Sequence, residues 1–160
     1  MNVMIIGAAG MIGRKLAERI AADGTVGGRA VDALHLVDVV PPTAPAGKID
    51  SIATEALDLS VAGSATRLVA RRPDLIFHFA AIVSGEAEAD FEKGYRINLD
   101  GTRDLFEAIR AESEKKPYCP RVVFTSSIAV FGAPFPELIP DEFHLTPLTS
   151  YGTQKAIGEL

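Results

Sequence analysis

Three glycines spaced three residues apart directly follow a short apolar run at the start of the chain. The run is Val3-Met4-Ile5-Ile6, and the glycines are Gly7, Gly10 and Gly13. A buried strand, a glycine turn and a helix in this order let the backbone approach a pyrophosphate, which the free N–H groups and the dipole of the helix then hold. The feature therefore predicts an α/β domain that binds a nucleotide.

Apolar strand-like runs alternate with helical segments along the whole chain. This alternation predicts a parallel sheet that is covered by helices on both faces. We expect strands over residues 2–6, 33–39, 52–57, 75–79 and 121–125. We expect helices over residues 11–22, 61–71 and 86–114, the last broken near Gly94, a long functional loop over residues 128–148, and a helix from about Thr149. Right-handed crossovers place the strands, numbered along the chain, in the order 3-2-1-4-5 of a doubly wound, Rossmann-type sheet, with the ligand at their carboxyl ends.

The composition favours one domain and argues against several kinds of partner. The chain has 160 residues, 48% of them hydrophobic, which is enough to form a core between one sheet and its helices. Its net charge of -5 comes without a block of like charge that would mark a nucleic-acid or membrane surface. Cys119 is the only cysteine, and no histidine has partners at metal-ligand spacing. We expect a cytoplasmic protein with a small-molecule substrate, no metal, no nucleic acid and no membrane.

Tyr151 and Lys155 lie one helical turn apart near the end of the chain. Positions i and i+4 share one face of a helix, so the ammonium group can lie beside the phenol. A phenol is a poor base near neutrality, but a positive charge within roughly 4 to 6 Å favours the phenolate. Ser126 and Ser127 end the fifth expected strand, where a hydroxyl can hold a substrate oxygen opposite Tyr151. With the glycine loop, these residues predict hydride transfer from an alcohol to a dinucleotide.

The ends of the other strands indicate how the dinucleotide is recognised. A carboxylate at Asp38 can accept hydrogen bonds from the adenosine ribose and would repel a 2′-phosphate, which favours NAD over NADP, although Arg14 leaves room for NADP. Asp58 either contacts the adenine or serves turn chemistry alone. Ala80-Ala81 either lets the cofactor pass closely or meets a packing need. The expected cofactor contacts are Gly7, Gly10, Met11, Ile12, Gly13, Asp38, Asp58, Leu59, Ala80, Ala81, Tyr151 and Lys155.

Three other polar features have a structural interpretation beside a functional one. His78 lies inside an apolar strand and is expected to be a core histidine with its hydrogen bonds satisfied. Glu86, Glu88 and Asp90 are expected to form a solvated helix start. Asn98 falls in a helix with apolar surroundings, where an unpaired amide is costly. It either satisfies a break in the backbone or orders a water for proton relay.

These motifs together resemble those of the extended short-chain dehydrogenase/reductase family, which includes nucleotide-sugar epimerases and dehydratases. The resemblance covers the whole chain. It rests on the glycine loop, His78-Phe79-Ala80-Ala81, Asn98-Leu99-Asp100-Gly101-Thr102, the Ser-Ser-Ile-Ala-Val-Phe-Gly segment of residues 126–132, and Tyr151 with Lys155. Aligned on Gly132, the catalytic serine of the family falls on Ser127. The resemblance implies NAD as cofactor, a homodimer, and catalysis by Tyr151, Lys155, Ser127 and Asn98.

Within that family, residues 83–91 and Phe131-Gly132-Ala133-Pro134 are most similar to D-erythronate dehydrogenases, which oxidise a four-carbon sugar acid with NAD. Phe131 stands where sugar-nucleotide epimerases usually carry tyrosine. This likeness implies oxidation of a secondary alcohol of a small sugar acid. The substrate contacts that it implies are Ser84, Gly85, Ser126, Ser127 and Tyr151.

Two alternatives to this function stay open. One is a nucleotide-sugar epimerase or dehydratase that keeps its NAD bound, and the other is a sensor or scaffold that binds NAD without catalysis. The chain stops five residues after Lys155. We therefore expect residues 1–160 to be the NAD-binding domain of a longer protein, truncated after the Tyr-x-x-x-Lys motif and without the substrate-binding half.

Overall fold

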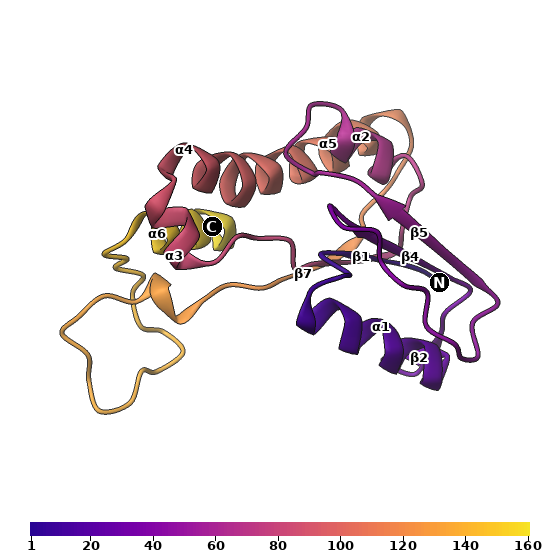
Figure 1. The fold of residues 1–160 in the computed structure, drawn as a ribbon, viewed down its shortest axis with the longest axis horizontal. Coiled ribbons are helices and arrows are strands. Elements are labelled where there is room, and N and C mark those ends of the chain that lie inside the picture. Colours follow the sequence, from indigo (N-terminus) through magenta and orange to yellow (C-terminus); the bar gives the residue numbers. More distant parts are fainter.

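Five parallel strands form the centre of the protein, in the spatial order β5-β4-β1-β6-β7 (Figure 1). The computed structural model describes all residues from 1 to 160. The strands are β1 (Asn2–Ile6), β4 (Ala33–Asp38), β5 (Ser51–Ala56), β6 (Leu75–His78) and β7 (Arg121–Phe124). Numbered among themselves, these strands follow the order 3-2-1-4-5, which confirms the predicted doubly wound, Rossmann-type sheet.

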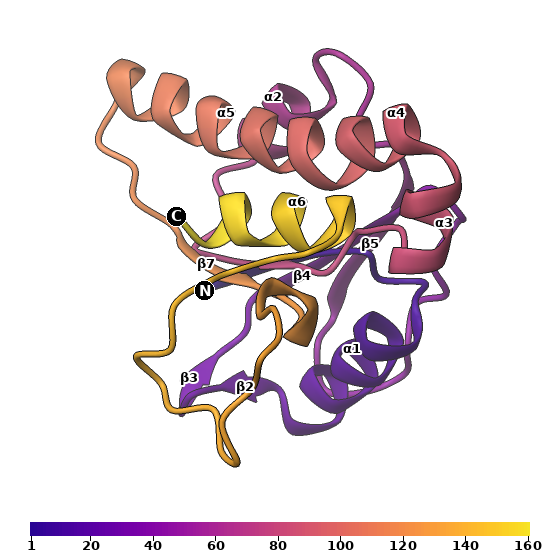
Figure 2. The same ribbon diagram turned by 90° about the vertical axis from the view of Figure 1, so that its left-hand side faces the viewer.

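Helices cover both faces of this sheet (Figures 1 and 2). On one face lies α1 (Met11–Asp23), and over the other lie α2 (Ser64–Val69) and α5 (Gly101–Lys115). The remaining helices are α3 (Ser84–Ala89), α4 (Phe91–Gly94), the π-helix η1 (Tyr95–Asp100), the 3-10 helix η2 (Ile128–Val130) and α6 (Ser150–Glu159). None of these helices has the length and apolar character that crossing a membrane requires.

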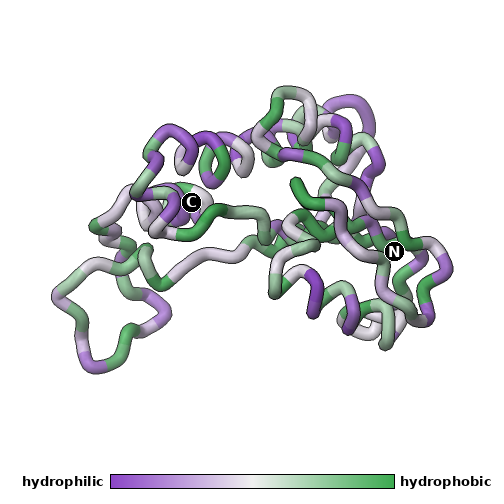
Figure 3. The backbone as a smooth tube through the Cα atoms, viewed as in Figure 1, coloured by the Kyte–Doolittle hydropathy of each residue, from purple (hydrophilic) through white to green (hydrophobic).

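The alternation of side chains along β1 divides the core into two buried clusters. Ile5 belongs to the same cluster as Ile20 of α1. Met4 belongs to the cluster that contains Leu68 of α2 and Leu105 of α5. Because successive residues of a strand point to opposite faces, a strand buried on both sides must be apolar throughout. Figure 3 shows these apolar strands between helices that alternate between polar and apolar residues.

A short hairpin that the sequence did not lead us to expect follows α1. Gly24 ends α1 with a φ of 71°. The strands β2 (Thr25–Val26) and β3 (Arg29–Ala30) then pair antiparallel. Gly27 and Gly28 connect them with φ values of 56° and 76°, the positive values that a two-residue hairpin turn requires.

The predicted helix over residues 86–114 is divided into α3, α4, η1 and α5, with an interruption at Asp90 and a change from α- to π-helix directly after Gly94, near which the break was predicted. The chain leaves helical geometry at Asp90, with φ of -132° and ψ of 89°. The Asp90 carboxylate then accepts a hydrogen bond from Lys93 N at 3.0 Å and begins α4. Gly94 itself is helical, with φ of -54° and ψ of -55°. Packing around Gly94 is tight, because a Cβ there would lie 3.0 Å from Nε2 of Gln154 and 3.1 Å from Ala87.

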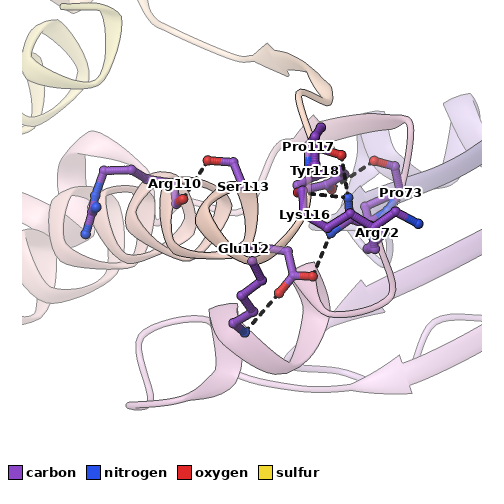
Figure 4. A network of polar contacts seen from close by, with 9 residues as sticks. Arg72, Pro73, Arg110, Glu112, Ser113, Lys116, Pro117 and Tyr118 are labelled. Atoms are coloured by element: carbon purple, nitrogen blue, oxygen red, sulfur yellow. Dashed lines mark hydrogen bonds and ion pairs between the residues drawn. The ribbon is translucent and has the colours of Figure 1, made fainter.

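Arg72 connects the link between α2 and β6 to the end of α5 (Figure 4). Its guanidinium donates to Glu112 Oε1 and to the Pro117 carbonyl, both at 2.7 Å, and lies 4.6 Å from the centroid of the Tyr118 ring. These contacts hold the segment that leads into β7. Cys119 comes directly after Tyr118 in the chain and is exposed. It lies at the amino end of the sheet, two residues before the start of β7.

Candidate active site

A cavity of about 420 Å³ opens at the carboxyl ends of β1, β4 and β6. Its lining residues come from the glycine loop and from the segments that follow β4, β5 and β6. Seven of the predicted cofactor contacts line it, namely Gly7, Gly10, Asp38, Asp58, Leu59, Ala80 and Ala81. The lining also includes apolar residues that were not predicted as cofactor contacts, among them Val39, Val40 and Ile97. The predicted contacts Met11, Ile12, Gly13, Tyr151 and Lys155 lie outside this lining.

The glycine loop fits a pyrophosphate because two of its glycines allow close backbone packing, and a Cβ on the third would have only one near neighbour, the carbonyl oxygen of Gly7 at 3.3 Å. A Cβ on Gly7, which has a φ of 91°, would lie 2.6 Å from Ala80 N. A Cβ on Gly13 would lie 2.1 Å from the carbonyl oxygen of Gly7. Gly10 has no such close neighbour and is the N-cap of α1, which has neither a capping side chain nor an acidic residue in its first turn. The N–H groups of that turn are therefore left for an anion.

The two acidic strand ends differ in what they bind. Asp38 Oδ2 accepts a hydrogen bond from Ala9 N at 2.9 Å, so this carboxylate holds the glycine loop against the end of β4. Its Oδ1 accepts from Val40 N at 3.3 Å. Asp58 Oδ1 accepts from both the N–H and the hydroxyl of Ser60, at 2.9 and 2.8 Å. The turn role considered for Asp58 is thus present, and contact with an adenine stays a prediction.

Tyr151 and Lys155 share one face of α6, as their spacing predicted. Nζ of Lys155 lies 5.9 Å from the centroid of the Tyr151 ring and 4.8 Å from that of Phe124, and it donates a hydrogen bond to the carbonyl of Thr125 at 3.1 Å. The side chain of Lys155 is buried, and this burial lowers its pKa to about 8. Below that pH it carries a positive charge beside the phenol ring.

The two serines after β7 use their hydroxyl groups differently. The exposed Ser126 donates a hydrogen bond to the carboxylate of Glu159, the last residue of α6. The half-buried Ser127 accepts one from Ala129 N at 3.2 Å, which begins η2. Its own hydroxyl proton is then free to reach a substrate oxygen. The substrate roles predicted for both serines stay predictions, and this geometry favours Ser127.

Asn98 lies in the π-helix and its side chain is fully engaged. Its Oδ1 accepts from Ile82 N at 2.9 Å, and its Nδ2 donates to the Ile82 carbonyl at 3.2 Å. Nδ2 also donates to Oε1 of Gln154 at 2.8 Å. Of the two roles considered for Asn98, pairing with an irregular backbone is the one its side-chain contacts support. A part in proton relay stays a prediction.

His78 is a core histidine with one nitrogen paired. Its Nε2 lies 2.9 Å from Oγ1 of Thr102, whose hydroxyl donates to the carbonyl of Asn98 at 2.7 Å. Nε2 therefore carries the proton, whereas Nδ1 is buried without a partner. Burial, reinforced by the charge of Lys155, lowers the pKa of His78 to about 4. The expectation that both nitrogens are satisfied was wrong for Nδ1.

The acidic residues of α3 are more than a solvated helix start. Glu86 pairs with Lys93. Glu88 Oε1 accepts hydrogen bonds from Ser150 Oγ at 2.9 Å and from Tyr151 N at 2.8 Å, so it caps the helix that carries the predicted base. The sequence carries no signal for this role, because the partners lie 62 and 63 residues away along the chain. The predicted substrate contacts Ser84 and Gly85 are exposed in the first turn of α3, and their role stays a prediction.

Comparison with known proteins agrees with this arrangement. D-erythronate dehydrogenase of Cupriavidus necator is 43% identical over 165 aligned residues, which cover 100% of this chain and 49% of that protein. A crystal structure described as the nucleoside-diphosphate-sugar epimerase from Agrobacterium tumefaciens superimposes with a TM-score of 0.96 at 65% identity, covering 99% of this chain and 46% of that one. UDP-glucose 4-epimerase from Brucella ovis, solved in complex with NAD, gives a TM-score of 0.76 at 28% identity, covering 99% of this chain and 45% of that one.

The chain spans about half the length of each of these proteins. The model of the NAD dependent epimerase/dehydratase family matches residues 3–160. The chain therefore belongs to the NAD dependent epimerase/dehydratase family.

Proposed function

We propose that these residues form the cofactor half of an NAD-dependent dehydrogenase that oxidises a secondary alcohol of a small sugar acid, D-erythronate or a close relative. The observation that carries this proposal is the Tyr151 and Lys155 pair, at the same end of the sheet as the dinucleotide cavity. It occurs in a chain that is 43% identical to a D-erythronate dehydrogenase. Because the chain spans about half of that relative, we assign the activity to the complete gene product.

The roles of the residues follow from their chemistry. Tyr151, as phenolate, takes the hydroxyl proton of the substrate, and the ammonium group of Lys155 stabilises the negative charge on the phenolate. Ser127 donates a hydrogen bond to the same substrate oxygen and holds the reacting carbon in place. The glycine loop and α1 would hold the pyrophosphate of NAD, and Asp38 would accept hydrogen bonds from its ribose hydroxyls. Bound there, NAD would supply the hydride acceptor that lets the alcohol become a ketone.

The substrate class rests on the segment after β6 and on Phe131. Ser84 and Gly85 are exposed near the carboxyl end of β6, where they are available to a hydroxyl or carboxylate of a sugar acid. Phe131 packs edge to face on Phe143 at a centroid distance of 5.8 Å. This position therefore presents an apolar ring and no phenol hydroxyl, which supports a small acid over a nucleotide sugar.

A nucleotide-sugar epimerase with retained NAD is the second candidate. It is favoured by the 65% identity to the structure described as a nucleoside-diphosphate-sugar epimerase. A sensor or scaffold that binds NAD without catalysis is disfavoured, because its expected mark is the loss of Tyr151 or Lys155, and both are present. We further propose that the complete protein is a homodimer.

Net NADH release separates the two enzymatic candidates. The complete gene product is given NAD and a panel of four- and five-carbon sugar acids, with UDP-sugars in parallel, and absorbance at the NADH band is followed. Steady NADH formation with D-erythronate or a close relative is the expected result. Conversion of a UDP-sugar without net NADH, and no reaction with any acid, would contradict the dehydrogenase and support the epimerase.

A further inference from the structure

A carboxylate of α3 binds the first turn of α6, more than 60 residues later in the chain. One oxygen of Glu88, Oε1, accepts both Tyr151 N at 2.8 Å and Ser150 Oγ at 2.9 Å. The first N–H groups of a helix have no partner within the helix, and a negative charge near them is favourable. The hydrogen bond from Tyr151 N, followed by that from the Ser150 hydroxyl, lowers the pKa of Glu88, so the carboxylate is ionised at neutral pH.

Glu88 does not duplicate the helix's own cap. Thr149 is the N-cap of α6, and its Oγ1 accepts a hydrogen bond from Gly152 N at 3.0 Å. Glu88 accepts the N–H of Tyr151, the residue that bears the phenol. The two caps therefore satisfy different N–H groups, and only the one from Glu88 comes from another helix.

A second contact joins the same regions one turn further along α6. Gln154, fully buried, accepts a hydrogen bond from Asn98 at 2.8 Å. Asn98 in turn pairs with both backbone groups of Ile82, in the segment between β6 and α3. Glu88 of α3 thus contacts the first turn of α6, and Asn98 of η1 contacts the same helix at Gln154. Two such points restrict both the rotation and the sliding of this helix.

We propose that Glu88 is a positioning residue for the general base. It fixes the first turn of α6 so that the phenol of Tyr151 stays beside Lys155. It also joins that turn to α3, whose own first turn carries Ser84 and Gly85, the residues expected to contact the substrate. The catalytic part of this inference rests on the function proposed above.

The chain offers variants that separate the hydrogen bond from the charge and from general damage to α3. Glu88→Ala removes the acceptor, whereas Glu88→Gln keeps an acceptor oxygen and removes the charge. Glu86→Ala is the matched control, because Glu86 lies in the same helix and pairs with Lys93, away from α6. All three are made in the complete gene product.

The expected effect of Glu88→Ala is on kcat. A displaced general base costs roughly 10- to 100-fold in kcat, with KM for the acid and Kd for NAD each changed by less than about threefold. Glu88→Gln is expected to restore most of this loss, and Glu86→Ala to behave as wild type. A wild-type kcat in Glu88→Ala, or a loss equal to its unfolded fraction, would overturn the inference.

Amide hydrogen exchange tests the contact independently of turnover. The amide of Tyr151 is expected to exchange at least about tenfold faster in Glu88→Ala than in wild type, and at the wild-type rate in Glu86→Ala. Equal exchange in all variants would overturn the inference. If wild type releases no NADH with any acid, the proposed function fails by itself. The same kcat comparison is then made on UDP-sugar conversion, where the loss in Glu88→Ala is again expected.

Discussion

Ser126 and Ser127 are adjacent in the chain, yet one donates its hydroxyl to Glu159 and the other accepts the N–H of Ala129. The proton of Ser127 is therefore available to a substrate oxygen. We expect Ser127→Ala to lower kcat roughly 100-fold, because it removes a donor that acts on the developing charge. Ser126→Ala is expected to stay within about threefold of wild type. Steady-state NADH formation measures both, and an equal loss in the two variants would show that Ser126 also serves the substrate.

Tyr151→Phe is expected to abolish turnover while leaving the affinity for NAD nearly intact. The substitution removes the hydroxyl that takes the proton but keeps the ring beside Lys155, so kcat should fall at least about 100-fold. Turnover is followed as NADH formation and NAD binding by fluorescence titration of the complete gene product. Undiminished turnover would eliminate Tyr151 as the base.

Gly13 and Gly10 are expected to respond differently to the same substitution. A Cβ on Gly13 would lie 2.1 Å from a backbone oxygen, so Gly13→Ala should lower the free energy of unfolding by about 3 kcal/mol or prevent folding. Gly10 has no neighbour closer than 3.3 Å and lines the cavity. Gly10→Ala should fold and bind NAD roughly tenfold more weakly. Thermal unfolding and NAD titration distinguish them, and equal stability of the two variants would contradict the packing argument.

Asp38→Asn is expected to shift the preference from NAD toward NADP. The amide oxygen can still accept the hydrogen bond from Ala9 N, while the negative charge that opposes a 2′-phosphate is gone. We expect the ratio of kcat/KM for NADP to that for NAD to rise at least about tenfold. Asp38→Ala is the comparison, because it also loses the Ala9 bond and should unfold more easily. An unchanged ratio in both variants would show that selectivity lies elsewhere.

His78 is expected to make the protein less stable in acid. The folded chain holds this imidazole neutral down to a pKa of about 4, whereas in the unfolded chain it gains a proton below its ordinary value of 6.5. The unfolded state binds more protons in this range. The contribution of His78 to the free energy of unfolding is therefore fully present above pH 6.5 and is lost as the pH falls to 4. Between these limits the free energy of unfolding of wild type should fall by up to about 3 kcal/mol more than that of His78→Leu. Urea denaturation across this range measures the difference, and parallel curves would contradict it.

The order of the strands was predictable because the central strands β1, β4 and β6 are buried and read as apolar runs, separated by helical segments. Right-handed crossovers then leave few ways to arrange the strands. The hairpin of β2 and β3 was not predictable in the same way, since strands of two residues show no alternation. Its only signal was the pair Gly27-Gly28, which marks a turn but no partner strands.

The site was predictable where its geometry is local. Tyr151 and Lys155 are one helical turn apart, so their shared face follows from the spacing. Glu88 and Gln154 were missed because the residues that they bind lie 63 and 56 positions away in the chain. A signal existed for Gln154, since it is a polar residue beside Lys155 on a helix that packs against the domain. Glu88 carried none, because its charge is typical of any exposed helix.

Cys119 gives the candidate site a natural reporter position. Among these 160 residues it is the single thiol, it is exposed, and it precedes β7 at the amino end of the sheet. The cavity lies at the opposite, carboxyl end, so the length of a strand, roughly 15 Å, separates the two. A maleimide dye on this sulfur would stay outside the cavity, yet close enough for energy transfer from NADH. Occupancy of the cofactor site is then readable as a change in dye emission, without altering any residue of the site.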